Sequence, residues 1–196
     1  MRLTALFALI AVSASAQVFE VGGQGGVSRI SSRNIGSIPG ATAGDPRSDV
    51  ELEDGWRFSF RATLNTTRFT GYEFGYAYNR SKLTIGGQDS GGMAIHQGLL
   101  NYVLYATPEG TRVRPFATGG VNFSNYVPPG ASVTSGGGDN KFGFNYGGGL
   151  KVILTDSLLL RFDARQYMNG KPFDLVGASG WLRQTEFSAG ISFYMH

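Results

Sequence analysis

The chain has 196 residues, no cysteine, and 17 basic against 14 acidic residues, which gives a formal net charge of +3. This length suits one domain, the lack of cysteine excludes a disulfide-bonded scaffold, and the scattered basic residues do not form a nucleic-acid-binding surface. Thirty glycines without a collagen repeat, together with 13% aromatic residues, favour an all-β chain.

The first sixteen residues have the organisation of a secretory signal peptide. Arg2 supplies a positive charge, Leu3–Val12 is a short apolar run, and Ser13–Ala16 ends in an Ala-x-Ala motif. We therefore expect cleavage after Ala16, which leaves one domain over residues 17–196. The apolar run is too short to cross a bilayer as a helix, and no other stretch approaches ~18 uninterrupted apolar residues.

Eight segments alternate apolar and polar residues with a period of two, as strands do when their two faces meet different surroundings. In chain order the predicted strands are Val18–Ile30, Gly55–Asn65, Phe69–Asn79, Met93–Tyr105, Arg112–Asn125, Phe142–Leu154, Leu158–Met168 and Trp181–Met195. Long connections alternate with short turns. The long ones are Ser31–Asp54, Arg80–Gly92, Tyr126–Lys141 and Asn169–Gly180, and the short ones are Thr66–Arg68, Thr107–Gly110 and Thr155–Ser157.

An even number of strands of about ten residues, joined by alternating short turns and long loops, is typical of outer-membrane barrels. We therefore predict an eight-stranded antiparallel up-and-down transmembrane β-barrel. Its four long loops would lie outside the cell and its two ends on the periplasmic side. Eight strands leave an interior only wide enough for side chains to fill, so we expect a polar, filled lumen.

The segment Leu158–Met168 has the polarity that the other strands repeat. Arg161, Asp163 and Arg165 share one face, and apolar residues fill the other. A soluble sandwich would bury the apolar face, whereas a membrane barrel turns it toward lipid. Ten charged residues fall on the predicted lumen face: Glu20, Arg57, Arg61, Glu73, Arg114, Lys151, Arg161, Asp163, Arg165 and Glu186. Burying so many charges in a dry core would cost more than their pairing returns, which favours the membrane arrangement.

Seven of these lumen charges lie in the turn-side half of the predicted barrel. They are Glu20, Arg61, Glu73, Arg114, Lys151, Arg161 and Asp163. We expect them to form one network of ion pairs. The loss of one member should leave an unpaired buried charge and destabilise the barrel by roughly a few kcal/mol.

Aromatic residues gather near both ends of the predicted strands, as in the interfacial belts of membrane proteins. On the loop side they are Trp56, Tyr78, Phe123, Tyr126, Phe142 and Trp181. On the turn side they are Phe19, Phe69, Tyr105 and Phe193. Aromatic residues favour strands in general, which explains their number but explains their placement less well.

No motif points to catalysis, a cofactor or a metal. The glycine groups at 22–26, 136–138 and 147–149 lack the spacing of a phosphate-binding loop, so we interpret them as packing positions in strands. The only histidines are His96 and His196, and neither has the serine partner that a barrel lipid hydrolase would need. We expect no catalytic residue, no cofactor and no metal.

One acidic run stands out in the first long loop. Its members are Asp45, Asp49, Glu51, Glu53 and Asp54. Such a run could hold Ca²⁺, or bridge the phosphates of lipopolysaccharide through cations. The simpler interpretation is a solvated loop face.

Four segments resemble the OmpA/OmpX-type outer-membrane β-barrel domain family of Gram-negative bacteria. They are Arg114–Gly120, Gly147–Lys151, Leu160–Arg165 and Ser188–Phe193. The resemblance implies insertion from the periplasm by the barrel-assembly machinery, which reads an alternating last strand. The chain departs from the family by ending on Met195-His196, where an aromatic residue is usual. No peptidoglycan-binding domain follows, so wall anchoring by that route is not implied.

Three functions stay open at this point. The first is a non-enzymatic integral outer-membrane barrel, structural or surface-interacting through its four outside loops. The second is a narrow porin for small solutes or ions, and the third is a lipid-modifying barrel enzyme. A soluble calyx-type barrel is the rival architecture, but it would need an apolar lumen. We expect a monomer in the cell outer membrane whose partners are outer-membrane lipid, lipopolysaccharide and, during insertion, the barrel-assembly machinery, with no nucleic acid.

Overall fold

The alternating segments form nine strands in the computed structural model, which describes residues 18–40, 45–132 and 137–195. The strands are β1 (Val18–Ile30), β2 (Asn34–Ser37), β3 (Asp49–Asn65), β4 (Thr70–Ile85), β5 (Gln88–Tyr105), β6 (Val113–Val127), β7 (Asp139–Ile153), β8 (Leu158–Gly170) and β9 (Trp181–Met195). One 3₁₀ turn, Pro46–Ser48, precedes β3. None of the helical segments in the described ranges is long and apolar enough to cross a membrane. The predicted signal peptide and His196 lie outside the described residues.

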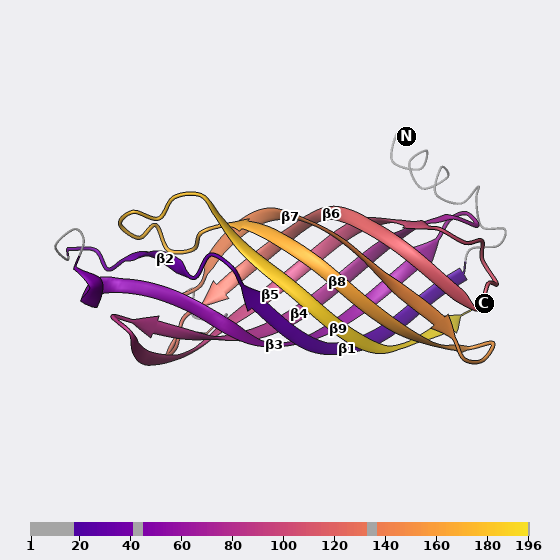
Figure 1. Ribbon diagram of the computed structural model, residues 1–196, viewed down its shortest axis with the longest axis horizontal. Helices are drawn as coiled ribbons and strands as arrows, with labels where there is room; N and C mark the ends of the chain where they lie inside the picture. Colours follow the sequence, from indigo (N-terminus) through magenta and orange to yellow (C-terminus); the bar gives the residue numbers. More distant parts are fainter. Residues whose placement is uncertain (1–17, 41–44, 133–136, 196) are drawn as a thin grey trace, which may run out of the picture.

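Eight of the strands close into an antiparallel barrel (Figure 1). Each long strand pairs with its neighbours in the chain, and β1 completes the ring by pairing with both β3 and β9. Phe19, for example, pairs with Leu64 on one side and Met195 on the other. β1 begins and β9 ends at the same end of the barrel as the short turns (Figure 1). The predicted eight-stranded barrel is confirmed, and β2 is an additional short strand on the edge of β3.

The prediction of a long loop over residues 80–92 is wrong. β4 continues to Ile85 and β5 begins at Gln88, so only Gly86 and Gly87 connect them. Both glycines have positive φ angles, 57° and 77°, which is the conformation of a type I′ turn. This turn follows the right-handed twist of the two strands, and therefore lets the hairpin extend well beyond the barrel wall.

β3 also begins earlier than predicted, at Asp49 instead of Gly55. Leu52 pairs with Leu83 and Gly55 with Ser81, so two residues of β3, Glu53 and Asp54, lie opposite one residue of β4. This β-bulge shifts the alternation by one residue. The regular alternation therefore breaks at the bulge, and the predicted strand begins only after it, at Gly55. β2, β3, β4 and β5 together project past the other strands on the loop side (Figure 1).

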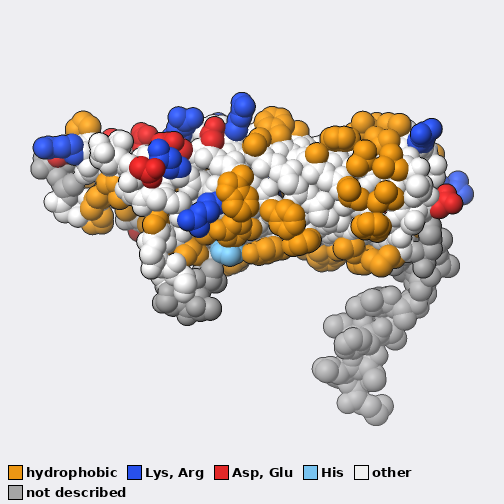
Figure 2. All heavy atoms as spheres, turned by 90° about the horizontal axis from the view of Figure 1, so that it is seen from below, with side chains coloured by type: hydrophobic (Ala, Val, Ile, Leu, Met, Phe, Trp, Pro, Cys, Tyr) orange, Lys and Arg blue, Asp and Glu red, His pale blue; other side chains and the backbone are white. Residues whose placement is uncertain are grey.

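The two faces of the barrel wall have opposite chemistry. Large apolar side chains on the outer face are solvent-exposed in the isolated chain, and they form a broad band on the face of the barrel that Figure 2 shows. Charged side chains gather at the loop-side end of that view (Figure 2). All ten predicted lumen charges are buried inside. The polar, filled lumen and the outward apolar face are therefore as predicted.

Candidate functional site: the filled lumen

Asp163 lies at the centre of a buried ion-pair network in the middle of the lumen. Its Oδ1 is 2.8 Å from Arg61 Nη1 and 2.8 Å from Arg165 Nη2, and its Oδ2 is 2.8 Å from Arg161 Nε. Arg161, Asp163 and Arg165 all lie on β8, whereas Arg61 lies on β3, across the lumen. Distances this short are those of charge-assisted hydrogen bonds, so Asp163 ties two strands of the wall together through the interior.

Two glutamates complete this network. Glu73 on β4 is 2.8 Å from Arg165 Nη2 and 2.5 Å from Arg161 Nη2. Glu186 on β9 is 2.7 Å from Arg61 Nη2 and 3.0 Å from Arg57 Nε. We call these side chains the ionic layer. Its four arginines and three carboxylates are Arg57, Arg61, Arg161, Arg165, Glu73, Asp163 and Glu186.

The remaining three predicted lumen charges form a separate group nearer the turns. Lys151 Nζ is 2.5 Å from Glu20 Oε2 and donates to the Tyr105 hydroxyl at 2.7 Å. The Arg114 guanidinium stacks 3.8 Å from the centroid of the Tyr105 ring and donates to the Arg68 carbonyl at 3.2 Å. The structure therefore divides the expected single network into the ionic layer and this turn-side group.

Aromatic rings separate the two charged groups. Tyr105 and Phe116 are neighbours, with ring centroids 6.3 Å apart. Phe116 contacts a cation of each group. The Arg161 guanidinium of the ionic layer lies 4.7 Å from the Phe116 ring centroid, and Lys151 Nζ of the turn-side group lies 5.8 Å from the same centroid. Cations placed over aromatic faces are stabilised by the ring quadrupole, so the rings act as contacts between the groups.

Tyr105 was predicted as a lipid-facing interfacial residue, and that prediction is wrong because its side chain is 5% exposed inside the lumen. The period of two explains the difference. Gln97 and Asn101 face inward on β5, so Tyr105 must face inward as well. Its position near the strand end suggested a belt residue, but its place in the alternation decides the face.

Amide side chains fill the lumen on the loop side of the ionic layer. Gln97 Oε1 accepts from Arg57 Nη1 at 2.6 Å and from Asn79 Nδ2 at 2.9 Å. Gln97 Nε2 in turn donates to the Ser124 hydroxyl at 3.1 Å and to Gln184 at 3.2 Å. Hydrogen bonds through these amides therefore connect Arg57 of the ionic layer to strands β4, β5, β6 and β9.

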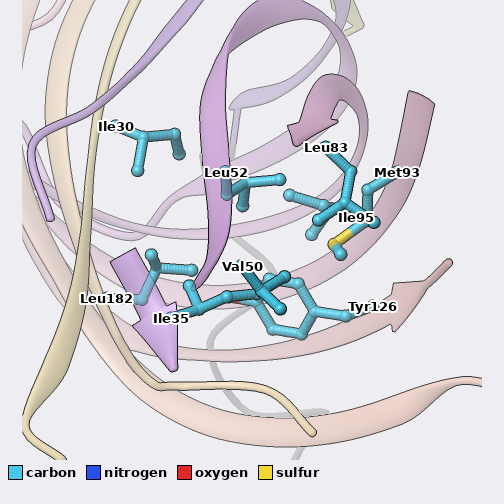
Figure 3. Packing of buried hydrophobic residues seen from close by; sticks show 9 residues of the cluster. All are labelled: Ile30, Ile35, Val50, Leu52, Leu83, Met93, Ile95, Tyr126 and Leu182. Atoms are coloured by element: carbon cyan, nitrogen blue, oxygen red, sulfur yellow. The ribbon is translucent and has the colours of Figure 1, made fainter. Parts of the chain in front are cut away.

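An apolar cluster closes the loop-side end of the lumen, where its side chains converge inside the barrel (Figure 3). We call it the apolar cap, and its members are Ile30, Ile35, Val50, Leu52, Leu83, Met93, Ile95, Tyr126 and Leu182. Phe173 and Leu175 of the last loop pack against it. An antiparallel bridge between Ser37 and Val176, with N···O distances of 2.9 and 3.1 Å, holds that loop over the cap.

The apolar cap was not predicted. Leu83, for example, lies in a segment that was assigned to a loop. Tyr126 was predicted as an interfacial aromatic, which is wrong because its side chain is fully buried in the cap. Asn122 and Ser124 face inward on β6, so the alternation places Tyr126 inward too. The signal was present in the sequence, since these inward positions become apolar toward the loop-side strand ends.

The other predicted belt residues lie on the outer face. Trp56, Phe69, Phe142, Phe123, Trp181, Phe19 and Phe193 are exposed there, and Tyr78 is half-buried. Neighbouring rings contact one another: the centroids of Trp56 and Tyr78 are 5.4 Å apart, and those of Phe144 and Trp181 are 5.4 Å apart. These rings mark the loop-side level at which the apolar wall gives way to water.

The candidate chemical groups are engaged in ordinary structural contacts. His96 Nδ1 lies 2.6 Å from the Tyr76 hydroxyl on the outer face. In the acidic run, Asp45 caps the 3₁₀ turn, Asp49 accepts from the Ser37 hydroxyl at 2.9 Å, and Asp54 accepts from the Ile30 amide at 2.8 Å. Among the described residues no group of three potential ligands could hold a metal ion.

The packing role predicted for the glycine groups holds only in part, because Gly23 and Gly25 have no atom closer than 3.9 Å to an added Cβ, and Gly137 and Gly138 precede β7 instead of lying in a strand. A Cβ on Gly147 would lie 2.2 Å from the Ala164 carbonyl oxygen, so β7 and β8 approach too closely there for any side chain. This contact lies beside the ionic layer, because Gly147 pairs with Arg165. Gly136 lies outside the described residues.

The family model of the outer membrane protein beta-barrel domain matches residues 3–194. No curated protein sequence matches the chain. Among solved structures, OprG from Pseudomonas aeruginosa is similar with a TM-score of 0.67 and 12% identity, covering 92% of this chain and 97% of that one. Neisserial surface protein A has a TM-score of 0.65 and 14% identity, with 91% and 99% covered. The N-terminal barrel of OprF, also from Pseudomonas aeruginosa, has a TM-score of 0.52 and 13% identity, with 91% and 97% covered.

Proposed function

Because the chain belongs to the outer-membrane β-barrel domain family and is an outer-membrane protein, we propose that it is a non-enzymatic barrel with a closed lumen. Its function would then lie in the surface that it presents outside the cell. The observation that carries this proposal is the filling of the lumen by chemically different layers, stacked along one axis.

The ionic layer supports a closed lumen because every one of its charges is bound to an opposite charge from another part of the wall. Arg61 alone contacts Glu73, Asp163 and Glu186, at 3.7, 2.8 and 2.7 Å. An ion that crossed this layer would have to break such contacts in a buried environment, which costs several kcal/mol for each unpaired charge. The apolar cap would add a second barrier, because an ion would lose its hydration there.

The contacts of His96 support a non-enzymatic role. Its ring lies on the lipid-facing wall, with Nδ1 engaged by the Tyr76 hydroxyl and with the Tyr78 ring 5.2 Å away. A hydrolase would need this imidazole beside a nucleophilic hydroxyl. The tyrosine hydroxyl is a poor nucleophile at neutral pH, so the pair fits an interfacial hydrogen bond better.

The projecting strands β2 to β5 support a surface-interacting role. Exposed Ile38 directly follows β2, exposed Arg47 lies in the 3₁₀ turn before β3, and exposed Asp89 lies in β5. The partners that we propose are the lipid and lipopolysaccharide around the barrel, and the barrel-assembly machinery during insertion. We also propose that the barrel functions as a monomer, since β1, β3 and β9 close the sheet within one chain.

Planar-bilayer recording separates this proposal from a narrow porin. The purified barrel should give no discrete conductance steps, whereas a wide porin reconstituted in the same way serves as the positive control. Reproducible steps that scale with salt concentration would contradict the closed lumen.

A second experiment separates the proposal from a lipid-modifying enzyme. The mass spectrum of lipid A from expressing cells should stay unchanged, and a defined mass shift would instead support a lipid-modifying enzyme.

A further inference from the structure

A groove of about 420 Å³ lies on the outer surface at the loop-side rim, where β1 ends and β9 begins. It is lined by Ser31, Ser32, Lys171, Ser179, Gly180, Trp181 and Arg183. We call it the basic groove. Ser32 fixes its shape, because its hydroxyl accepts from the Arg183 amide at 2.9 Å and donates to the Trp181 carbonyl at 3.1 Å.

Positive charge in the basic groove is not balanced. Lys171 and Arg183 line it, and no carboxylate does. Arg29 lies close by on the same outer face, because it pairs with Thr185, two residues from Arg183. None of these three cations makes an ion pair with another residue of the described ranges. The groove therefore presents several free cations to whatever lies against it.

A second groove on the loop side has equal numbers of positive and negative side chains. It has a volume of about 350 Å³ and lies beside Trp56. Its cations Arg80 and Lys82 share the lining with Asp54 and Asp89, and Lys82 Nζ is 3.6 Å from Asp89. This balanced groove provides an internal control, because its lining also contains one tryptophan and two cations.

Trp181 fixes the level of the basic groove relative to the membrane. Its ring is 48% exposed on the outer face and contacts Phe144 at a centroid distance of 5.4 Å. Tryptophan prefers the depth of the lipid headgroups, so the neighbouring cations lie at that depth too. Arginine and lysine bind phosphate oxygens strongly, and serine hydroxyls can add hydrogen bonds.

We propose that the basic groove binds the phosphorylated headgroup of an outer-leaflet lipid, namely the phosphates of the lipid A part of lipopolysaccharide. Lys171 and Arg183 contact the phosphate oxygens, Ser31 and Ser179 donate hydrogen bonds, and Trp181 packs against the sugar or the first acyl carbons. The proposal rests on the lipid partner suggested above, but not on the closed lumen. A failure of this site would therefore leave the conductance result standing.

The test compares two double variants of the purified full barrel in detergent. Lys171→Gln with Arg183→Gln removes the charges of the basic groove, and Arg80→Gln with Lys82→Gln removes those of the balanced groove. Bound diphosphoryl lipid A is quantified by native mass spectrometry. The first variant should bind roughly 10- to 30-fold more weakly than the wild type, and the second should change by less than about threefold. Lipid A without phosphates should bind the wild type as weakly as diphosphoryl lipid A binds the first variant.

Heat-modifiable gel mobility checks that each variant is folded, and Arg183→Lys, which keeps the charge, should retain most of the binding. Equal lipid A affinity in the wild type and the first variant would overturn the proposal. It would also be overturned if a soluble sulfated sugar or inorganic phosphate matched lipid A in affinity and showed the same loss. That result would assign the groove to a soluble anion.

Discussion

The ionic layer and the apolar cap fill the same lumen by opposite means. In the ionic layer, inward side chains such as Asp163 and Arg61 make charge pairs across the barrel. In the apolar cap, inward side chains such as Leu52 and Ile95 pack by shape alone (Figure 3). The outer face changes in the reverse sense, from apolar rings below the rim to charged side chains above it (Figure 2).

This difference follows from what surrounds each part of the wall. Within the membrane, lipid accepts the apolar side chains, so polar residues are left to fill the lumen. Above the rim, water surrounds the projecting strands, and they bury apolar residues as a soluble sheet does. β3 makes the change through its bulge: Trp56 and Phe58 face outward, but Val50 and Leu52, also at even positions, face inward. One strand therefore belongs to a membrane barrel at one end and to a soluble sheet at the other.

The largest expected effect comes from breaking the ionic layer. Asp163→Asn removes a negative charge that contacts three arginines, and leaves the four buried arginines of the ionic layer with only Glu73 and Glu186 to balance them. We expect a loss of about 3–5 kcal/mol in the free energy of unfolding. Urea unfolding in lipid vesicles measures it, with Asp89→Asn on the exposed hairpin as the control. A loss below about 1 kcal/mol would mean that the layer is wet and not tightly paired.

A smaller effect is expected from the apolar cap. Leu52→Ala leaves a cavity among packed side chains, and should cost about 2–3 kcal/mol. The damage should stay on the loop side, with faster hydrogen exchange in β2 and the upper part of β3 but not around Asp163. If exchange rose equally throughout β3 to Asn65, the two layers would be one cooperative unit and the comparison would fail.

The hairpin tip should be less sensitive again. Gly87 has a φ of 77° and open space around it, so Gly87→Ala introduces backbone strain without a clash. A loss of about 1 kcal/mol is expected, confined to the tip. Hydrogen exchange at Ile85 and Gln88 reports it, and Gly98→Ala, a strand position with equally open space, is the comparison. Equal effects at both sites would contradict a positive-φ turn.

The smallest effect belongs to the exposed ion pair between Lys82 and Asp89. Both side chains are largely in water, at 46% and 62% exposure, and Lys82→Gln should change the stability by less than about 0.5 kcal/mol. The contrast with Asp163→Asn would show that burial, and not the presence of an ion pair, decides the energy. A loss above about 2 kcal/mol would remove that contrast.

The alternation of residues was enough to predict the barrel, the strand pairing and the inward face of each charge. The same period of two places Tyr105 and Tyr126 in the lumen, and it decides their face against their position near strand ends. Gly86-Gly87 was an available hairpin signal. The bulge at Glu53 and Asp54 was not, because a one-residue shift leaves no mark beyond a broken pattern.

The pairing of charges could not be predicted from the sequence. Whether Lys151 meets Glu20 or Glu73 depends on the tilt and stagger of the strands, which set the level of β7 against β1 across the lumen. The division into two charged groups also depends on Phe116 lying between them. These are distances through the interior between residues far apart in the chain, and the period of two carries no information on them.

The most direct test of the closed lumen is the labelling of a single introduced cysteine. The sequence has no cysteine of its own, so each introduced thiol reports on one position. Ser124 lies one inward position below Tyr126 of the apolar cap, and Ser90 lies near the exposed hairpin tip. The folded barrels of the two variants, Ser124→Cys and Ser90→Cys, are each treated from the outside with a membrane-impermeant thiol reagent. The account predicts rapid labelling at Ser90→Cys, and labelling at Ser124→Cys only as fast as the barrel unfolds. Similar rates at both sites would contradict a sealed lumen.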